Sequence, residues 1–133
     1  MTITLDEALA LTASCRDTAR TEGMRIIAVV VDAGAHTVVL TRMDGAIAGG
    51  VEAATAKARA AVLYQRPTSA FATSYQEGRP LHCLPGAIPL GGGIPLMRDG
   101  RMIGALGVSG AVEKTETELA ERIVAEWEAL EAM

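Results

Sequence analysis

Aromatic residues are scarce in this chain of 133 residues, which has one tryptophan, two tyrosines and one phenylalanine. So few rings leave little material for the stacking surfaces on which single-stranded nucleic acids bind. Positive charge is also in short supply, because 12 basic residues stand against 16 acidic ones and the formal net charge is −4. A chain without a basic excess has no general attraction for nucleic acid. The sequence therefore predicts no nucleic-acid partner.

Long apolar runs and paired cysteines are missing as well. No run approaches the roughly 18 apolar residues that indicate a membrane-spanning helix, so we expect no membrane insertion. The small, apolar N-terminus resembles a signal peptide, but Asp6 and Glu7 stand where such a peptide carries positive charge. Cys15 and Cys83 allow at most one disulfide, and free thiols fit a reducing compartment. We therefore expect a cytoplasmic protein.

The first half of the chain alternates helical and extended patterns. Apolar spacing behind a capping-box motif predicts a helix over 4–22. The β-branched runs 25–32 and 36–43 predict a hairpin, and its first strand is central because it is apolar on both faces. The alanine-rich segment 47–65 predicts a second helix, since alanine is the best helix former.

The second half repeats this order. A short helix is expected over 68–78, followed by a loop rich in proline and glycine. The turn Asp99-Gly100 joins 93–98 to 101–109 as a hairpin, and a helix over 115–132 begins at a second capping-box pattern. Because short hairpin links make strand pairs antiparallel, residues 1–133 predict one α+β domain with an antiparallel sheet flanked by helices.

Three consecutive glycines, Gly91 to Gly93, raise the question of a phosphate-binding loop. The dinucleotide fingerprint fails because Leu96 stands in place of the third glycine and a strand, not a helix, follows. A P-loop is excluded, since the chain contains no Gly-Lys-Ser or Gly-Lys-Thr. The glycines instead indicate entry into an edge strand to which another backbone comes close. Gly104, Gly107 and Gly110, within and just after the next strand, also indicate that something packs tightly against the backbone, and this neighbour is either the alanine-rich helix or a ligand.

Donor side chains for a metal or cofactor are few. His82 and Cys83 are adjacent, while Cys15 and His36 are distant in sequence, so the three or four ligands of a zinc site are not assembled. Haem needs a single axial ligand, and His36, His82 or Cys83 could each supply it. His36 also fits a simple exposed position near a hairpin turn.

A second group of candidates is charged. Arg42 and Asp44 lie where the first hairpin ends, and Lys57 lies among alanines of the second helix. Lys57 either holds the carboxylate of a ligand, or reaches water, or pairs with an acid such as Glu52 or Asp44. These alternatives are open at the level of sequence.

Two long stretches resemble the GlcG/HbpS family of haem-binding-like proteins, which includes the C-terminal domain of PduO-type proteins. They are VVDAGAHTVVLTRMDGAIAGGVEAATAKARAAV and GGGIPLMRDGRMIGALGVSGA, followed by an acidic closing helix. The resemblance covers nearly the whole chain, and its motifs are specific in combination. It implies a profilin-like or Roadblock-like single domain and homo-oligomers that commonly reach tetramers or octamers. Some members bind haem or a corrinoid-related ligand.

Two functions follow as hypotheses from the resemblance and the residues. In the first, a small ligand, with haem as a candidate, is held by residues of the glycine-rich region: His82, Cys83, Gly92, Gly93 and Ser109. In the second, a cofactor-free lyase or isomerase acts on a small carboxylate or carbonyl compound. Arg42 or Lys57 would bind the anionic group of the substrate, and Asp44, Glu116 or His82 would transfer the proton.

Overall fold

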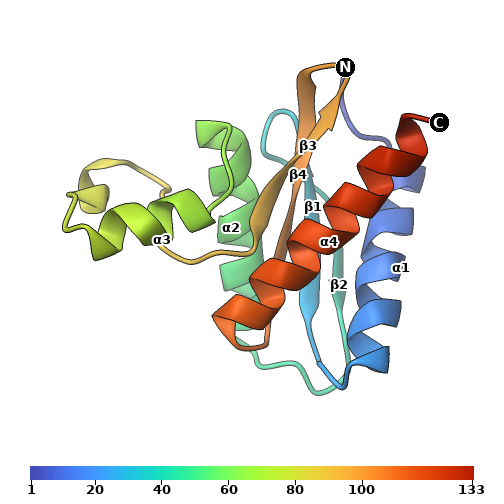
Figure 1. Ribbon diagram of the computed structural model, residues 1–133. Coiled ribbons are helices and arrows are strands. Elements are labelled where there is room, and N and C mark those ends of the chain that lie inside the picture. The colour runs from blue at the N-terminus through green and yellow to red at the C-terminus, as the bar shows by residue number, and fades with distance from the viewer.

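One open antiparallel sheet, with the strand order β2-β1-β4-β3, forms the centre of the molecule (Figure 1). The computed structural model describes residues 1–133. The strands are β1 (Ile27–Asp32), β2 (Thr37–Arg42), β3 (Gly93–Arg98) and β4 (Arg101–Ser109). Both predicted hairpins are therefore present, and they are joined by the pairing of β1 with β4.

Helices cover both faces of this sheet. One face carries α1 (Leu5–Thr21) and α4 (Glu113–Glu131), and the other carries α2 (Gly50–Tyr64). Figure 1 shows α3 (Ser69–Gln76) extending past α2. The 3₁₀ turn η1 (Leu81–Cys83) lies in the loop that follows α3 in the chain. This arrangement confirms the predicted α+β class with an antiparallel sheet flanked by helices.

The central position predicted for the first strand is also confirmed. Residues Ile27 to Val31 of β1 are all at most 1 % exposed. Because successive side chains of a strand point to opposite faces, Ala28 and Val30 pack against α1 and α4, while Val29 packs against α2. A strand apolar on both faces thus sits where both faces are covered.

Glycine in β4 allows α2 to lie directly on the sheet. A Cβ atom at Gly107 would lie 2.2 Å from the carbonyl oxygen of Ala54 and 2.7 Å from the backbone nitrogen of Ala58. Any side chain at position 107 would therefore push the helix away. The neighbour of the strand glycine is the alanine-rich helix, and the small side chains of both elements make the close approach possible.

Helix starts differ from expectation at α2, which begins at Gly50 and not at residue 47, and at α4, which begins at Glu113 and not at Thr115. The capping box of α1 forms as predicted, with Thr4 and Glu7 satisfying each other's backbone N–H groups. The second capping box, at Thr115, is wrong: α4 starts at Glu113, and Val112 is its N-cap without any side-chain hydrogen bond. Since β4 ends at Ser109, the chain enters the helix almost directly and Thr115 already lies in its first turn. None of the helices has the length and apolar character needed to cross a membrane.

Candidate functional site

A buried ion pair joins α2 to α4. The Nζ atom of Lys57 lies 2.5 Å from Oε1 of Glu116, and their side chains are only 1 % and 6 % exposed. Lys57 Nζ also donates to the carbonyl oxygen of Val108 at 3.0 Å, and Glu116 Oε2 accepts from the backbone N–H of Ala111 at 3.0 Å. Each charge is therefore neutralised and hydrogen-bonded inside the protein, as a buried charge requires.

The glycine-rich segment before β3 closes over this ion pair. A Cβ at Gly92, where φ is +119°, would lie 2.7 Å from the Val108 carbonyl oxygen and 3.2 Å from Lys57 Nζ. A Cβ at Gly93 would lie 2.3 Å from the Lys57 carbonyl oxygen, and the Gly93 N–H donates to Thr68 Oγ1 at 2.9 Å. The bare backbone at these two glycines thus packs against α2, which leaves no room for a ligand between them and Lys57.

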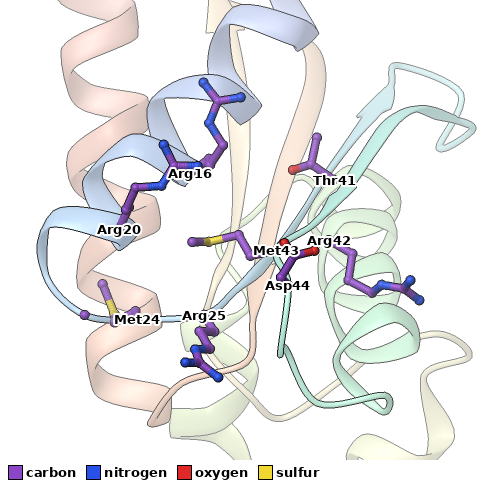
Figure 2. Close-up of a pocket in the computed structure, with 9 residues that line it drawn as sticks. Arg16, Arg20, Met24, Arg25, Thr41, Arg42, Met43 and Asp44 are labelled. Carbon is purple, nitrogen blue, oxygen red and sulfur yellow. The ribbon is translucent and has the colours of Figure 1, made fainter.

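A second charged region is open to solvent. A hollow of about 540 Å³, here called the arginine hollow, lies between the C-terminal end of α1 and the ends of β1 and β2. Figure 2 shows Arg16 and Arg20 extending from α1 on one side and Met43 pointing toward that helix from the other. Arg42 extends away from Arg16 and Arg20 (Figure 2). The hollow is lined by Arg16, Arg20, Gly23, Met24, Arg25, Thr41, Arg42, Met43 and Asp44.

His82 and Cys83 lie in neither of these regions. They form part of the arm, residues 69–90, which comprises α3, η1 and the loop that leads toward β3. Both side chains are exposed, and Cys83 is a free thiol. Cys15, in contrast, is fully buried, and burial raises the pKa of its thiol to about 12. Cys83 is thus the accessible cysteine of the protein.

Apolar surface adjoins the exposed donors of the arm. A hollow of about 360 Å³, here called the arm hollow, opens between α2 and Gly86. Leu63 forms part of its wall and is 50 % exposed, while Leu84 and Leu90 of the arm are each 41 % exposed. The arm returns to the body through a hydrogen bond of 2.5 Å from the Tyr64 hydroxyl to the Pro85 carbonyl oxygen.

Sequence and fold comparisons agree on the family. Residues 3–125 match the family described as haem degrading protein HbpS-like. The chain belongs to the HbpS-like family. Protein GlcG of Escherichia coli K12 is 33 % identical over 103 residues, which are 77 % of each chain.

Solved structures extend this family likeness to the fold. Protein ORFY of Klebsiella pneumoniae superposes with a TM-score of 0.88 at 29 % identity, covering 96 % of this chain and 91 % of its own. A crystal structure of PduOC in complex with haem superposes with a TM-score of 0.86 at 28 % identity, covering 94 % of both chains. The resemblance predicted from the sequence motifs is confirmed.

The candidate residues of this HbpS-like chain fall into three separate places. Lys57 and Glu116 meet beneath the glycine-rich segment, with Gly92, Gly93 and the buried Ser109 nearby in β3 and β4. Arg42 and Asp44 line the arginine hollow. His82 and Cys83 lie on the arm.

Lys57 pairs with an acid, which was one of its three alternatives, but the acid is neither Glu52 nor Asp44. Its partner is Glu116, 59 residues later in the chain, and the buried lysine does not reach water. His36 lies in the exposed position near a hairpin turn that was one of its alternatives. Its side chain is 82 % exposed in the β1–β2 turn, and its Nδ1 lies 3.7 Å from Asp32 Oδ1.

Sequence reasoning missed three arginines of the arginine hollow. Arg16 and Arg20 are four residues apart near the end of the first predicted helix, and Arg25 follows its terminating glycine. The signal was available, since two like charges at this spacing lie on the same helix face. What the sequence did not reveal is that the end of β2 lies beside that face.

Proposed function

We propose that this HbpS-like protein binds haem, and that the arm supplies the axial ligand. The observation that carries the proposal is the superposition on the PduOC–haem complex over 94 % of both chains. The family description, haem degrading protein HbpS-like, supports it.

The residues of the arm fit such a ligand. Haem iron accepts a histidine or a cysteine thiolate as axial ligand, and both donors are exposed and adjacent in η1. The ring needs apolar contacts, and Leu63 in the wall of the arm hollow and the exposed Leu84 and Leu90 of the arm can offer them. Bound haem would supply redox chemistry at its iron, while His82 or Cys83 would hold the iron and the leucines would exclude water.

Exposed apolar side chains support assembly of several copies. Ile47 is 65 % exposed, Tyr75 is 64 % exposed and Leu63 is 50 % exposed. A second copy packed on these residues would remove them from water and would cover a ligand at the arm. The homo-oligomer that we propose is a tetramer or octamer, and light scattering that finds only a monomer would contradict it.

Haem titration tests the assignment. Purified protein should develop a saturable Soret band, and His82→Ala should shift or abolish it because the axial imidazole is lost. If Cys83 is the ligand, Cys83→Ser should have this effect in place of His82→Ala. His36→Ala is the matched control, since His36 is also an exposed histidine and lies on a different loop.

Two outcomes would contradict the proposal. The first is wild-type protein that leaves the haem spectrum unchanged. The second is a doubly substituted protein, His82→Ala with Cys83→Ser, that binds haem with the wild-type spectrum, since the arm would then hold no ligand to the iron.

No observation in the structure favours the enzyme hypothesis to the same degree. Lys57 and Glu116, two of the proposed catalytic groups, satisfy each other in the interior. Arg42 and Asp44 lie at the arginine hollow, apart from that pair. The candidate acid, base and anion-binding groups therefore do not converge on one open cavity.

A further inference from the structure

The arginine hollow concentrates positive charge on an acidic protein. Four of the chain's 12 basic residues line it, with Asp44 as the single acid, so its lining carries a formal charge of +3 where the whole chain carries −4. Half of the eight other basic side chains already have a carboxylate partner. Lys57, Arg79, Arg98 and Arg122 each lie within 4 Å of a glutamate.

The arginines of the hollow lack such partners. Arg20, Arg25 and Arg42 have no carboxylate within 4 Å, and Asp44 pairs with none of them. Arg16 contacts only the neighbouring Asp17, at 3.0 Å, and both of these side chains are about half exposed. The guanidinium groups are therefore available to a ligand.

Helix stability does not explain the arrangement. A basic residue in the last turn of α1 interacts favourably with the partial negative charge at the helix end, which accounts for Arg20. Arg16 and Arg20, however, are like charges at a spacing of four residues, and such pairs destabilise a helix. Arg25 adds a third charge at the same hollow.

We propose that the arginine hollow binds a small molecule that carries two or more carboxylate or phosphate groups. Arg16 and Arg20, which extend from α1 at the hollow, contact its anionic groups (Figure 2). Guanidinium groups suit this ligand class because each can donate two parallel hydrogen bonds to one oxyanion. A volume of about 540 Å³ lies within the range of small-molecule sites.

This site is distinct from the proposed haem site on the arm. The hollow adjoins α1, while the arm extends past α2, and these two helices cover opposite faces of the sheet (Figure 1). Loss of one site should therefore leave the other intact. Arg42 has no part in ligand binding, because its side chain extends away from Arg16 and Arg20 (Figure 2).

Calorimetric titration with citrate and, separately, with pyrophosphate tests the proposal. Ionic strength is held constant with sodium chloride so that general screening does not change. At least one of the two anions should bind saturably, with a Kd below about 1 mM. Citrate binding alone would assign the hollow to carboxylates, pyrophosphate binding alone would assign it to phosphates, and both results support an oxyanion site.

Substitution locates the binding. The double change Arg16→Gln and Arg20→Gln should raise the Kd of the anion by about tenfold or more, because charge-assisted hydrogen bonds are lost. Arg101→Gln is the matched control, since Arg101 is an exposed arginine without a carboxylate partner on the distant β3–β4 turn. It should change the Kd by less than about twofold.

Arginine side-chain Nε–H resonances give a second measurement that does not depend on stability. Those of Arg16 and Arg20 should shift on titration, and that of Arg101 should not. The proposal is overturned if neither anion binds saturably, or if Arg101→Gln weakens binding as much as the double change. It is also overturned if the shifts spread over all arginines.

Discussion

The protein gathers charge in two places that differ in almost every physical respect. At the Lys57–Glu116 pair, one cation and one anion are buried, hydrogen-bonded and 2.5 Å apart. At the arginine hollow, four cations are exposed to solvent and three of them have no carboxylate within 4 Å. The charges of the ion pair compensate each other within the chain, and those of the arginine hollow are not compensated in this way.

This difference separates a structural role from a binding role. A buried pair is compensated only if both partners stay in place, so its residues hold α2 and α4 together. Exposed like charges contribute little to the free energy of folding. Their most favourable interaction is with a bound ligand of opposite charge. Substitutions should therefore affect stability strongly at the first place and ligand binding at the second.

The largest effect is expected for Lys57→Met. Glu116 would remain buried without its cation, and breaking such a pair costs about 3–5 kcal/mol. The free energy of unfolding in urea measures this loss. Lys114→Met, at an exposed lysine of α4 without a carboxylate partner, should change stability by less than about 0.5 kcal/mol. Equal stability of the two variants would show that the pair does not hold the helices.

The next largest loss of stability is expected where α2, the helix that carries Lys57, packs on β4. Gly107→Ala would place a Cβ 2.2 Å from the Ala54 carbonyl oxygen and shift α2 away from the sheet, at a cost of about 1–3 kcal/mol. Thermal unfolding measures the change. Gly49→Ala, where an added Cβ meets nothing within 4 Å, is the control and should not destabilise the protein. A neutral Gly107→Ala would mean that the close approach of helix and sheet is not required.

Glu7 offers an intermediate case, since it is paired but remains 20 % exposed. Burial alone would raise its pKa, but hydrogen bonds from Arg98 and Thr4 outweigh this and lower the pKa from 4.5 to about 2. The stabilisation is therefore present above pH 4.5 and is lost as the pH falls toward 2. Glu7→Gln should cost about 1 kcal/mol at pH 7, because the pair is partly screened by solvent.

The pH dependence distinguishes this charge effect from loss of the helix cap. Glutamine can still accept the hydrogen bond of the Thr4 N–H, so the variant keeps the cap and loses the charge. Its unfolding free energy should be flatter than that of the wild type between pH 4.5 and 2. Glu126→Gln, at an exposed glutamate without an ion pair, should follow the wild-type curve, and a parallel curve for Glu7→Gln would contradict the assignment.

The smallest effect on stability is expected for Arg20→Gln. Without added anion, the free energy of unfolding should change by less than about 0.5 kcal/mol, because relief of repulsion from Arg16 offsets the lost interaction with the helix end. Chemical denaturation in sodium chloride alone measures it. A loss comparable to that of Lys57→Met would place Arg20 among the structural charges and remove the contrast between the two places.

Local pattern was sufficient for most of the fold. Helical spacing predicted α1 within one residue at each end, and alternating apolar runs on both sides of Asp99-Gly100 predicted β3 and β4 with their observed bounds. These signals are local because a helix or hairpin is defined by residues close in sequence. The wrong capping box at Thr115 shows the limit of this reasoning, because the residue at which α4 begins depends on where the preceding strand ends.

The candidate site was predicted less well, because its members depend on how helices pack across the sheet. Lys57 was recognised as unusual among alanines, but its partner lies 59 residues away on α4. Gly92 and Gly93 were recognised as points of close approach, but whether a helix or a ligand approached them could not be read from their spacing. Arg20 and Arg25 were overlooked because their common hollow exists only once α1 lies beside β2.

The sequence by itself determined the element order, the central place of β1 and membership of the HbpS-like family. It did so because periodicity, turn residues and family motifs are properties of the chain. Only the tertiary structure decided which charges are compensated and which remain free. The reason is that burial and pairing depend on neighbours brought from distant segments: Lys57 is buried against Glu116, while Arg20 lines a hollow that is open to solvent.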